Sequence, residues 1–292
     1  MNAYFFPFFA VSIWAFNTIV SKLSVGIVDA SAMAFYRWFF AFLVLTPFVI
    51  HGVWRELRTV RDNIGKIAIL GLLRIVIYQS IIYVAVQSVP ATTLAIFGGL
   101  VPILILLCST IILRTPLTIW MLFGFVLAFC GVLYLSSKGE LSNLGSLQGQ
   151  TGEFLLLLSS SAYALYTVLV KKWNIQLNTW RFLYLQIGIG LIILFPFFLY
   201  QGNYQLSTDG IGLISYAAIP ASLLAPYFWL KGVEKIGANR SALFLNLTPL
   251  LTISLAVIIL KEPIHQYLMI GAGLIIAGIA CTFIGSKTRK SV

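Results

Sequence analysis

The sequence is dominated by long apolar runs that are separated by short polar connections. A helix needs about 20 mostly apolar residues to cross the hydrocarbon core of a bilayer. Ten runs of that kind are present, five on each side of a connection rich in Gly, Ser and Asn from Lys138 to Thr151. Their approximate bounds are 4–21, 31–50, 66–86, 91–112 and 118–136 in the first group, and 153–170, 179–199, 210–230, 240–260 and 264–285 in the second. The pattern predicts an all-α integral membrane protein with ten transmembrane helices.

The two groups of five runs match each other at nearly constant offsets. Apolar matches between hydrophobic helices are common by chance, but matched Pro, Gly and Lys positions are not. A shift of 149 residues aligns Lys171 with Lys22 and Pro196 with Pro47. A shift of 147 residues aligns the later pairs, which are Pro249 with Pro102, Pro263 with Pro116, Gly271 with Gly124, and Gly278 with Gly131. We therefore expect two five-helix repeats, residues 1–145 and 146–292, within one transmembrane domain. Five is odd, so the second repeat is inverted relative to the first, as in many alternating-access transporters.

Composition and charge agree with a membrane domain. Of the 292 residues, 60% are hydrophobic and only 9% are charged, whereas a soluble chain carries roughly 25% charged residues. The net charge of +11 is explained by the positive-inside rule better than by nucleic acid, because the basic residues lie between the apolar runs. Fourteen Lys and Arg residues fall on the side that holds both termini and three on the other side, which are Lys22, Lys138 and Lys261. This asymmetry places both termini in the cytoplasm, in a multi-pass protein of the cytoplasmic (inner) membrane.

Several stretches carry a resemblance to a known family. They are Ala91 to Pro102 and Ala238 to Pro249, each followed by an apolar run that ends in polar residues and Pro. With Trp14, Asn17 and Lys22 of the first helix, they resemble the EamA-type branch of the drug/metabolite transporter (DMT) superfamily. The resemblance implies a five-plus-five-helix transporter of amino acids, nucleotide-linked metabolites, cofactors or toxic compounds. Such proteins commonly have Glu at the end of the fourth helix of each repeat. Here Glu262 matches, but Thr115 replaces the first Glu.

Two arginines lie inside the predicted helices, where an ionisable group usually marks a cavity or a partner. Arg74 is halfway along the third helix. Its planar guanidinium suits a substrate carboxylate or phosphate, and the alternative is pairing with helix carbonyls or a polar neighbour. Arg37 is seven residues into the second helix, among aromatic residues, where snorkelling or cation–π packing competes with substrate contact. Their repeat counterparts, Ala221 and Gln186, are uncharged.

Polar and aromatic residues near these arginines form a predicted lining for a small-molecule pocket, which typically mixes aromatic walls with a few polar groups. Helical spacing links Tyr78 to Arg74, with Gln79 adjacent. The same spacing pairs Trp14 with Asn17 in the first helix and Tyr163 with Tyr166 in the sixth, and Asn246 precedes Pro249. For each aromatic residue, ordinary helix packing is the competing interpretation.

Other side chains limit the chemistry. All eight Asp and Glu residues lie in connections or near helix ends, so proton coupling through a buried carboxylate and a lipophilic-cation substrate are disfavoured. We interpret Cys108, Cys130 and Cys281 as small core residues, since they lack metal-ligand spacing. Glycine-rich surfaces of the fifth and tenth helices suit close helix contact, either within the chain or in a homodimer.

The sequence therefore predicts a secondary transporter that moves a small metabolite, with a carboxylate or another anionic group, by alternating access. The expected partners are that substrate and membrane lipids, with a homodimer left open, and neither nucleic acid nor a cofactor nor a metal is expected. A passive facilitator and an exporter of drugs or toxic metabolites remain alternatives. An intramembrane enzyme is disfavoured because the chain lacks the His-Glu-x-x-His and Gly-x-Ser-x-Gly motifs and any pair of mid-membrane aspartates.

Overall fold

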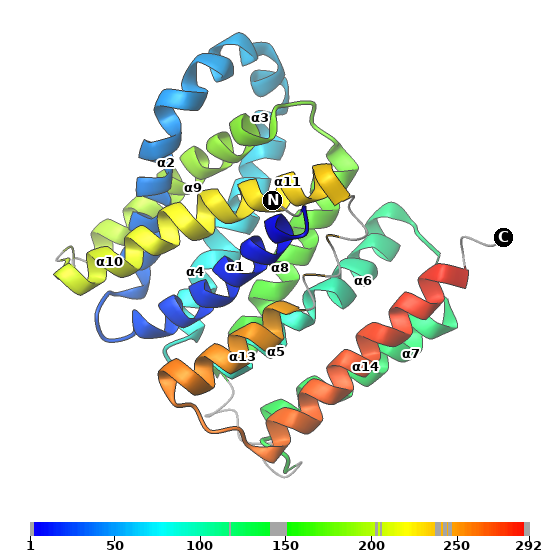
Figure 1. The fold of residues 1–292 in the computed structure, drawn as a ribbon. Coiled ribbons are helices and arrows are strands. Elements are labelled where there is room, and N and C mark those ends of the chain that lie inside the picture. Colours follow the sequence, from blue (N-terminus) through cyan, green and yellow to red (C-terminus); the bar gives the residue numbers. More distant parts are fainter. Residues whose placement is uncertain are drawn as a thin grey trace.

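The computed structural model describes residues 3–116, 118–140, 151–201, 204, 206–236, 241, 244 and 247–288. These residues form helices and no β-strand, which confirms the predicted all-α class (Figure 1). The first half contains α1 (Phe5–Leu23), α2 (Ala30–Arg55), α3 (Leu57–Gly71), η1 (Leu72–Tyr78), α4 (Gln79–Ala85), α5 (Ala91–Gly99), α6 (Val101–Leu113) and α7 (Ile119–Ser136). The second half contains α8 (Thr151–Trp173), α9 (Thr179–Gln201), α10 (Thr208–Tyr216), η4 (Ala217–Leu224), α11 (Ala225–Ile236), α13 (Leu247–Leu260) and α14 (Gln266–Thr288).

Seven of the described helical spans are long and apolar enough to cross a membrane. They are Phe5–Leu23, Ala30–Arg55, Leu57–Ala85, Ala91–Leu113, Thr151–Trp173, Thr179–Gln201 and Thr208–Ile236. Three shorter apolar helices, Ile119–Leu135, Leu247–Leu260 and Gln266–Gly278, fall in the remaining predicted runs. Helices suit this setting because they satisfy their backbone hydrogen bonds internally in the absence of water. The structure is that of a multi-pass helical membrane protein.

The third and eighth predicted runs are interrupted in the middle by π-helical segments. η1 joins α3 to α4, and η4 joins α10 to α11. π-helical turns are rare in proteins, and those that occur are often found at functional sites. Pro220 lies inside η4, where its missing N–H removes an α-helical hydrogen bond. The apolar pattern predicts a helix in both runs but contains no signal for this change in hydrogen bonding.

The helices α6 and α13 end in the same way. Arg114 and Lys261, the residues after their last turns, adopt left-handed conformations with φ of 52° and 55°. The next residue then donates its backbone N–H to the carbonyl six residues earlier, from Thr115 to Ser109 (3.4 Å) and from Glu262 to Ala256 (3.3 Å). A left-handed residue is a common way for a helix to end, and here both helices share it together with the same hydrogen bond. Thr115 and Glu262 therefore occupy equivalent backbone positions at the ends of two equivalent helices.

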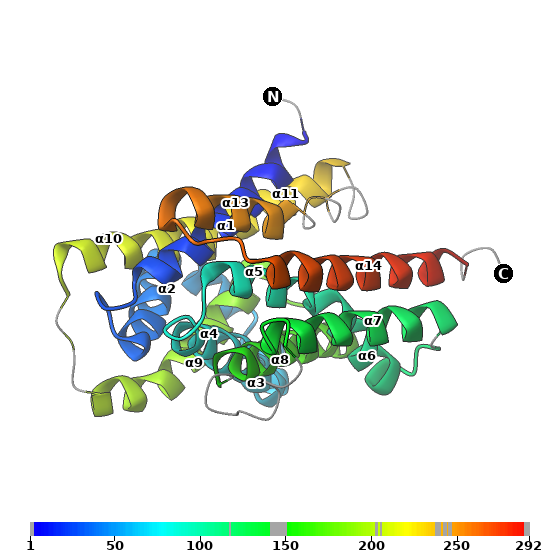
Figure 2. The same cartoon turned by 90° about the horizontal axis from the view of Figure 1, so that it is seen from below.

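The helices α7 and α14 lie side by side along their length (Figures 1 and 2). A Cβ atom on Gly131 would lie 2.9 Å from the Gly271 carbonyl oxygen, and one on Gly278 would lie 2.5 Å from that of Gly124. Only glycine allows so close an approach. The small residues that the sequence assigned either to packing or to a homodimer thus bring two helices of the same chain together.

The prediction that the three cysteines are core residues is wrong. Cys130 on α7 is exposed, and Cys108 and Cys281 are only partly buried. A thiol behaves as a small apolar group, so it also suits a helix surface that faces hydrocarbon.

The helices α2 and α9 pack against each other and contribute most of the largest hydrophobic cluster, together with parts of η1 and η4. Near the start of α2 and the end of α9, the rings of Phe35 and Phe198 stack with centroids 4.4 Å apart. The Tyr36 ring meets Phe198 edge-on at 5.0 Å. Aromatic side chains therefore fill this end of the α2–α9 pair.

Candidate functional site

Four of the predicted site residues meet between η1 and α8. Arg74 Nη1 donates a hydrogen bond to the Tyr166 hydroxyl (3.2 Å), and Arg74 Cζ lies 5.5 Å from the centroid of the Tyr166 ring. The Tyr163 ring centroid is 4.6 Å from that of Tyr78 and 5.7 Å from that of Tyr166. Ser159 Oγ donates to the Tyr78 carbonyl at 2.9 Å, which fixes η1 against α8. One guanidinium thus stands beside three phenol rings.

Arg37 is buried, with 5% of its surface exposed, and it joins three elements. Its Nε donates to Ser222 Oγ on η4, and its Nη1 donates to the Tyr83 hydroxyl on α4, both at 2.9 Å. Its Cζ lies 5.2 Å from the centroid of the Trp38 ring. The snorkelling interpretation is therefore wrong, because the guanidinium points into the protein and finds partners there. The cation–π packing is present.

Trp14 also attaches to η4. Its Nε1 donates to the Ala221 carbonyl (3.2 Å), and its rings lie 5.9 Å from those of Trp229. Within η4 the Ala225 N–H bonds to the Pro220 carbonyl, and Pro226 has no N–H, which explains how Ala221 can accept this bond. Asn17 follows Trp14 by one turn of α1, and its Oδ1 is buried without a hydrogen-bond partner among the described residues.

The remaining predicted lining residues are dispersed. Gln79 is buried on α4. Gln186, the repeat counterpart of Arg37, is fully buried on α9, and its amide has no hydrogen-bond partner in the described part of the chain. Asn246 lies outside the described residues.

The interior of the protein carries positive charge that no described carboxylate balances. The two ion pairs found among the described residues, Glu56–Arg181 and Lys231–Glu234, involve neither Arg37 nor Arg74. Arg37 bonds to Tyr83 of α4, and α4 directly continues η1, which carries Arg74, so both arginines lie along one helical run. Buried charges are costly unless they are paired. The arrangement therefore favours an anion between η1, α2 and α8.

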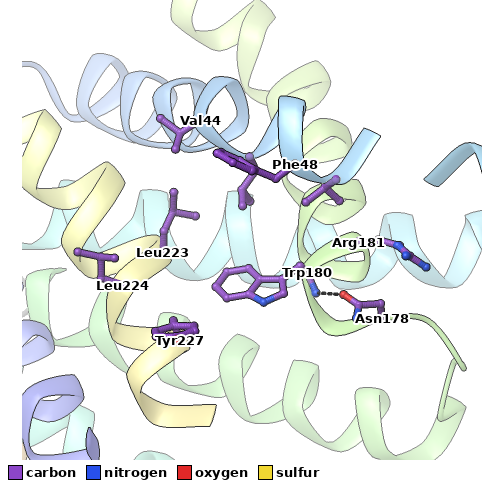
Figure 3. Close-up of a pocket in the computed structure, with 10 residues that line it drawn as sticks. Val44, Phe48, Asn178, Trp180, Arg181, Leu223, Leu224 and Tyr227 are labelled. Carbon is purple, nitrogen blue, oxygen red and sulfur yellow. Dashed lines mark hydrogen bonds between the residues drawn. The ribbon is translucent and has the colours of Figure 1, made fainter. Parts of the chain in front are cut away.

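A cavity of about 510 Å³ lies between α2, the start of α9, η4 and α11. Its volume is typical of sites for small molecules. Figure 3 shows the Trp180 indole in its middle, with Leu223, Leu224 and Tyr227 on one side and Val44 and Phe48 on the other. The complete lining is Val44, Leu45, Phe48, Val49, Asn178, Trp180, Arg181, Leu223, Leu224 and Tyr227.

Two of the polar side chains of this cavity are engaged by the protein. Asn178 Oδ1 accepts a hydrogen bond from the backbone N–H of Trp180 at 3.0 Å. The Arg181 guanidinium pairs with Glu56 and points away from the Trp180 ring (Figure 3). The cavity therefore presents a mainly aromatic and aliphatic wall.

None of the predicted site residues lines this cavity, and the link between the two regions is η4. Ser222 of η4 bonds to Arg37, whereas the next two residues, Leu223 and Leu224, form part of the cavity wall. Sequence reasoning missed Phe48, Trp180 and Tyr227, because a single aromatic residue in an apolar run is equally typical of helix packing. It also missed Ser222 and Tyr83 as partners of Arg37.

Comparison with known proteins decides the family. The model of the EamA-like transporter family matches residues 1–137 and again residues 150–284, which together cover nearly the whole chain. The chain belongs to the EamA-like transporter family. This membership confirms the resemblance inferred from the sequence.

The EamA-like chain is similar to several transporters. "Uncharacterized transporter YyaM" of Bacillus subtilis (strain 168) is 26% identical over 264 residues, which are 89% of this chain and 86% of that protein. "Uncharacterized transporter YetK" of the same organism is 25% identical over 293 residues, 98% of this chain and 88% of that protein. "Probable biotin transporter" of Pseudomonas aeruginosa is 25% identical over 253 residues, 82% of each chain.

A protein of known crystal structure has the same fold. It superposes with a TM-score of 0.61, covers 99% of this chain and 98% of its own, and is 17% identical. The EamA-like protein is thus a multi-pass membrane transporter and not an enzyme, as its sequence predicted.

Proposed function

We propose that this EamA-like protein is a secondary transporter that carries a small anionic metabolite across the cytoplasmic membrane by alternating access. The observation that carries the proposal is the pair of interior guanidinium groups, Arg37 and Arg74, without a carboxylate partner among the described residues. A substrate carboxylate or phosphate would supply the missing negative charge. Arg37 already has two hydrogen-bond partners and a ring contact, so Arg74 is the group that receives the anion.

The rest of the substrate is small and partly aromatic or zwitterionic. The Tyr78, Tyr163 and Tyr166 rings offer flat apolar surfaces beside Arg74. The cavity wall, with Trp180 and Tyr227, offers the same chemistry on the route to the surface. One relative is named as a probable biotin transporter, and biotin combines a carboxylate with an apolar body. Biotin is therefore a suitable first probe of this chemical class.

The architecture behind the proposal is ten helices in two inverted repeats. It is supported by the two separate matches to the family model, 1–137 and 150–284. The π-helical segments η1 and η4 fall at corresponding places in the two halves, and α6 and α13 share one type of helix end. The excess of Lys and Arg on one side supports cytoplasmic termini. In the proposed topology, Lys22 and Glu262 lie at the outer end and the cavity lies at the cytoplasmic end.

Uptake into proteoliposomes tests the proposal. Purified protein is offered radiolabelled biotin and a panel of small carboxylates and phosphates, each beside its neutral amide or ester. Arg74→Gln is compared with Arg61→Gln, which removes the same charge from an exposed site on α3. We expect saturable uptake of an acid but not of its neutral analogue. Loss of hydrogen bonds to a charged group predicts a KM at least about tenfold higher in Arg74→Gln and unchanged in Arg61→Gln.

Two results would overturn the proposal. Wild-type KM in Arg74→Gln for the carried substrate would remove Arg74 from the site. Uptake that is confined to neutral or cationic compounds would show that the interior charge is structural.

A passive facilitator or exchanger is the second candidate function. No described hydrogen bond or ion pair joins Arg37 or Arg74 to an Asp or Glu residue, so no carboxylate paired with these arginines is available for proton coupling. Uptake that is unchanged when the proton gradient is dissipated would favour this mode of transport.

A further inference from the structure

Two charged side chains hold the short connection between α4 and α5 from opposite sides. Lys22 Nζ, in the last turn of α1, donates to the carbonyls of Val86 (2.9 Å) and Val89 (2.8 Å). The Glu262 carboxylate, just after α13, accepts from the backbone N–H groups of Ala91 (2.7 Å) and Thr92 (3.0 Å). We call these two side chains with their four backbone partners the clamp.

The polarity of the clamp matches the helix ends that it meets. The cation lies at the carbonyl end of α4, and the anion lies at the N–H end of α5, so each side chain satisfies groups that have no partner within their helix. The bonds are charge-assisted, which makes them the strong kind. Through them α1 and α13 are both fastened to the α4–α5 connection.

Among the described residues the other repeat shows no equivalent, and Ala238 and Asn239, the counterparts of Ala91 and Thr92, lie outside them. Thr115 occupies the same position after α6 as Glu262 does after α13, but it has no carboxylate. Lys171, the counterpart of Lys22, is exposed and has no ion pair among the described residues. The clamp is therefore present at one end of the molecule, and the 510 Å³ cavity lies at the opposite end of α2.

We propose that the Lys22–Glu262 clamp keeps the outer end of the transporter closed and thereby sets the resting preference for the state open at the cavity end. This inference rests on alternating access. Opening of the outer end requires α1 and α13 to separate from the α4–α5 connection, and that movement breaks the clamp. Weakening the clamp therefore shifts the population towards the outward-open state.

Cysteine accessibility tests the inference without a known substrate. In nanodiscs, with the three native cysteines replaced by alanine, one reporter is Thr93→Cys, buried in the first turn of α5 behind the clamp. The other is Val49→Cys in the cavity wall. Each is combined with Glu262→Gln or Lys22→Met, and with Glu234→Gln as a control that neutralises an exposed glutamate.

We expect reciprocal changes in the rate of maleimide labelling. Loss of two charge-assisted bonds raises the Thr93→Cys rate at least about tenfold and lowers the Val49→Cys rate, whereas Glu234→Gln changes neither. An unchanged Thr93→Cys rate in both clamp variants would overturn the inference, and so would a rise at both reporters, which indicates loosened packing. A rise at Thr93→Cys alone supports the clamp but contradicts alternating access, so the two proposals fail separately.

Discussion

The two ends of the α2–α9 pair are equivalent in the repeat but are packed differently. At the clamp end, Phe35 of α2 stacks on Phe198 of α9 at 4.4 Å. At the cavity end, the repeat counterpart of Phe35 is Tyr184, and that of Phe198 is Val49. Tyr184 stacks instead on Phe42, also at 4.4 Å, and Val49 lines the cavity. A valine in place of a phenylalanine leaves the space that the other end fills.

This difference teaches how a duplicated scaffold can favour one state. The equivalent backbone carries Phe198 and Glu262 at one end, and Val49 and Thr115 at the other. Phe198 stacks on an aromatic ring and Glu262 ties helices together, whereas Val49 is a smaller side chain and Thr115 has no carboxylate. In the proposed transport cycle, these differences bias one end towards closure and the other towards opening.

The largest expected effect comes from removing an aromatic side chain that fills the clamp end of the α2–α9 pair. Phe198→Ala removes the ring that stacks on Phe35, and removal of a buried phenylalanine side chain costs about 3–5 kcal/mol. We expect a lower unfolding temperature together with faster labelling of Thr93→Cys. Phe197→Ala is the matched control, because Phe197 is mostly exposed on the same helix. Equal effects of the two variants would show that the Phe35–Phe198 stack does not close this end.

Filling the open end should have an intermediate effect. Val49→Phe gives the cavity end the residue found at the clamp end and adds a ring that can occupy part of the cavity. We expect the cavity to close and the uptake rate in proteoliposomes to fall by about tenfold. Ile192→Phe adds similar volume at an exposed position of α9 and should leave uptake unchanged. Normal uptake by Val49→Phe would contradict a role of the cavity in transport.

The smallest effect is expected from moving the acidic half of the clamp to the other end. Thr115→Glu places a carboxylate on the backbone position equivalent to Glu262. If the carboxylate acts at this end as Glu262 acts at the other, the rate of Val49→Cys labelling should fall by about twofold to fivefold. Thr115→Gln, whose side chain has the same size as Glu but no charge, should leave the rate of Val49→Cys labelling unchanged. A rate that is the same in both variants would show that a carboxylate alone does not bias this end.

Much of the fold follows from the sequence. Seven of the ten apolar runs coincide with helical spans long enough to cross a membrane, and the other three overlap shorter described apolar helices. The length and hydropathy that a membrane span needs are visible locally in the sequence. The grouping of Arg74 with Tyr78, Tyr163 and Tyr166 was also within reach, since helical spacing and the repeat put them on facing surfaces. Their role in binding stays a prediction.

Other features depend on contacts that only the folded chain creates. Arg37 was ambiguous because its partners, Tyr83 and Ser222, are 46 and 185 residues away. Val49 lines the cavity whereas its repeat counterpart Phe198 stacks on Phe35, and this contrast appears only once α2 and α9 are paired. Glu262 was visible in the sequence as an asymmetry, but its bonds to Ala91 and Thr92 were not.

Distances across both ends of the same protein test the account most directly. Spin labels at Gln87 and His265 report on the clamp end, and labels at Trp54 and Lys235 report on the cavity end; all four positions are exposed. Pulsed electron paramagnetic resonance in nanodiscs then compares wild type with Glu262→Gln. We expect the first distance to lengthen and the second to shorten in the variant. Two distances that lengthen together, or that both stay fixed, would contradict reciprocal opening of the two ends.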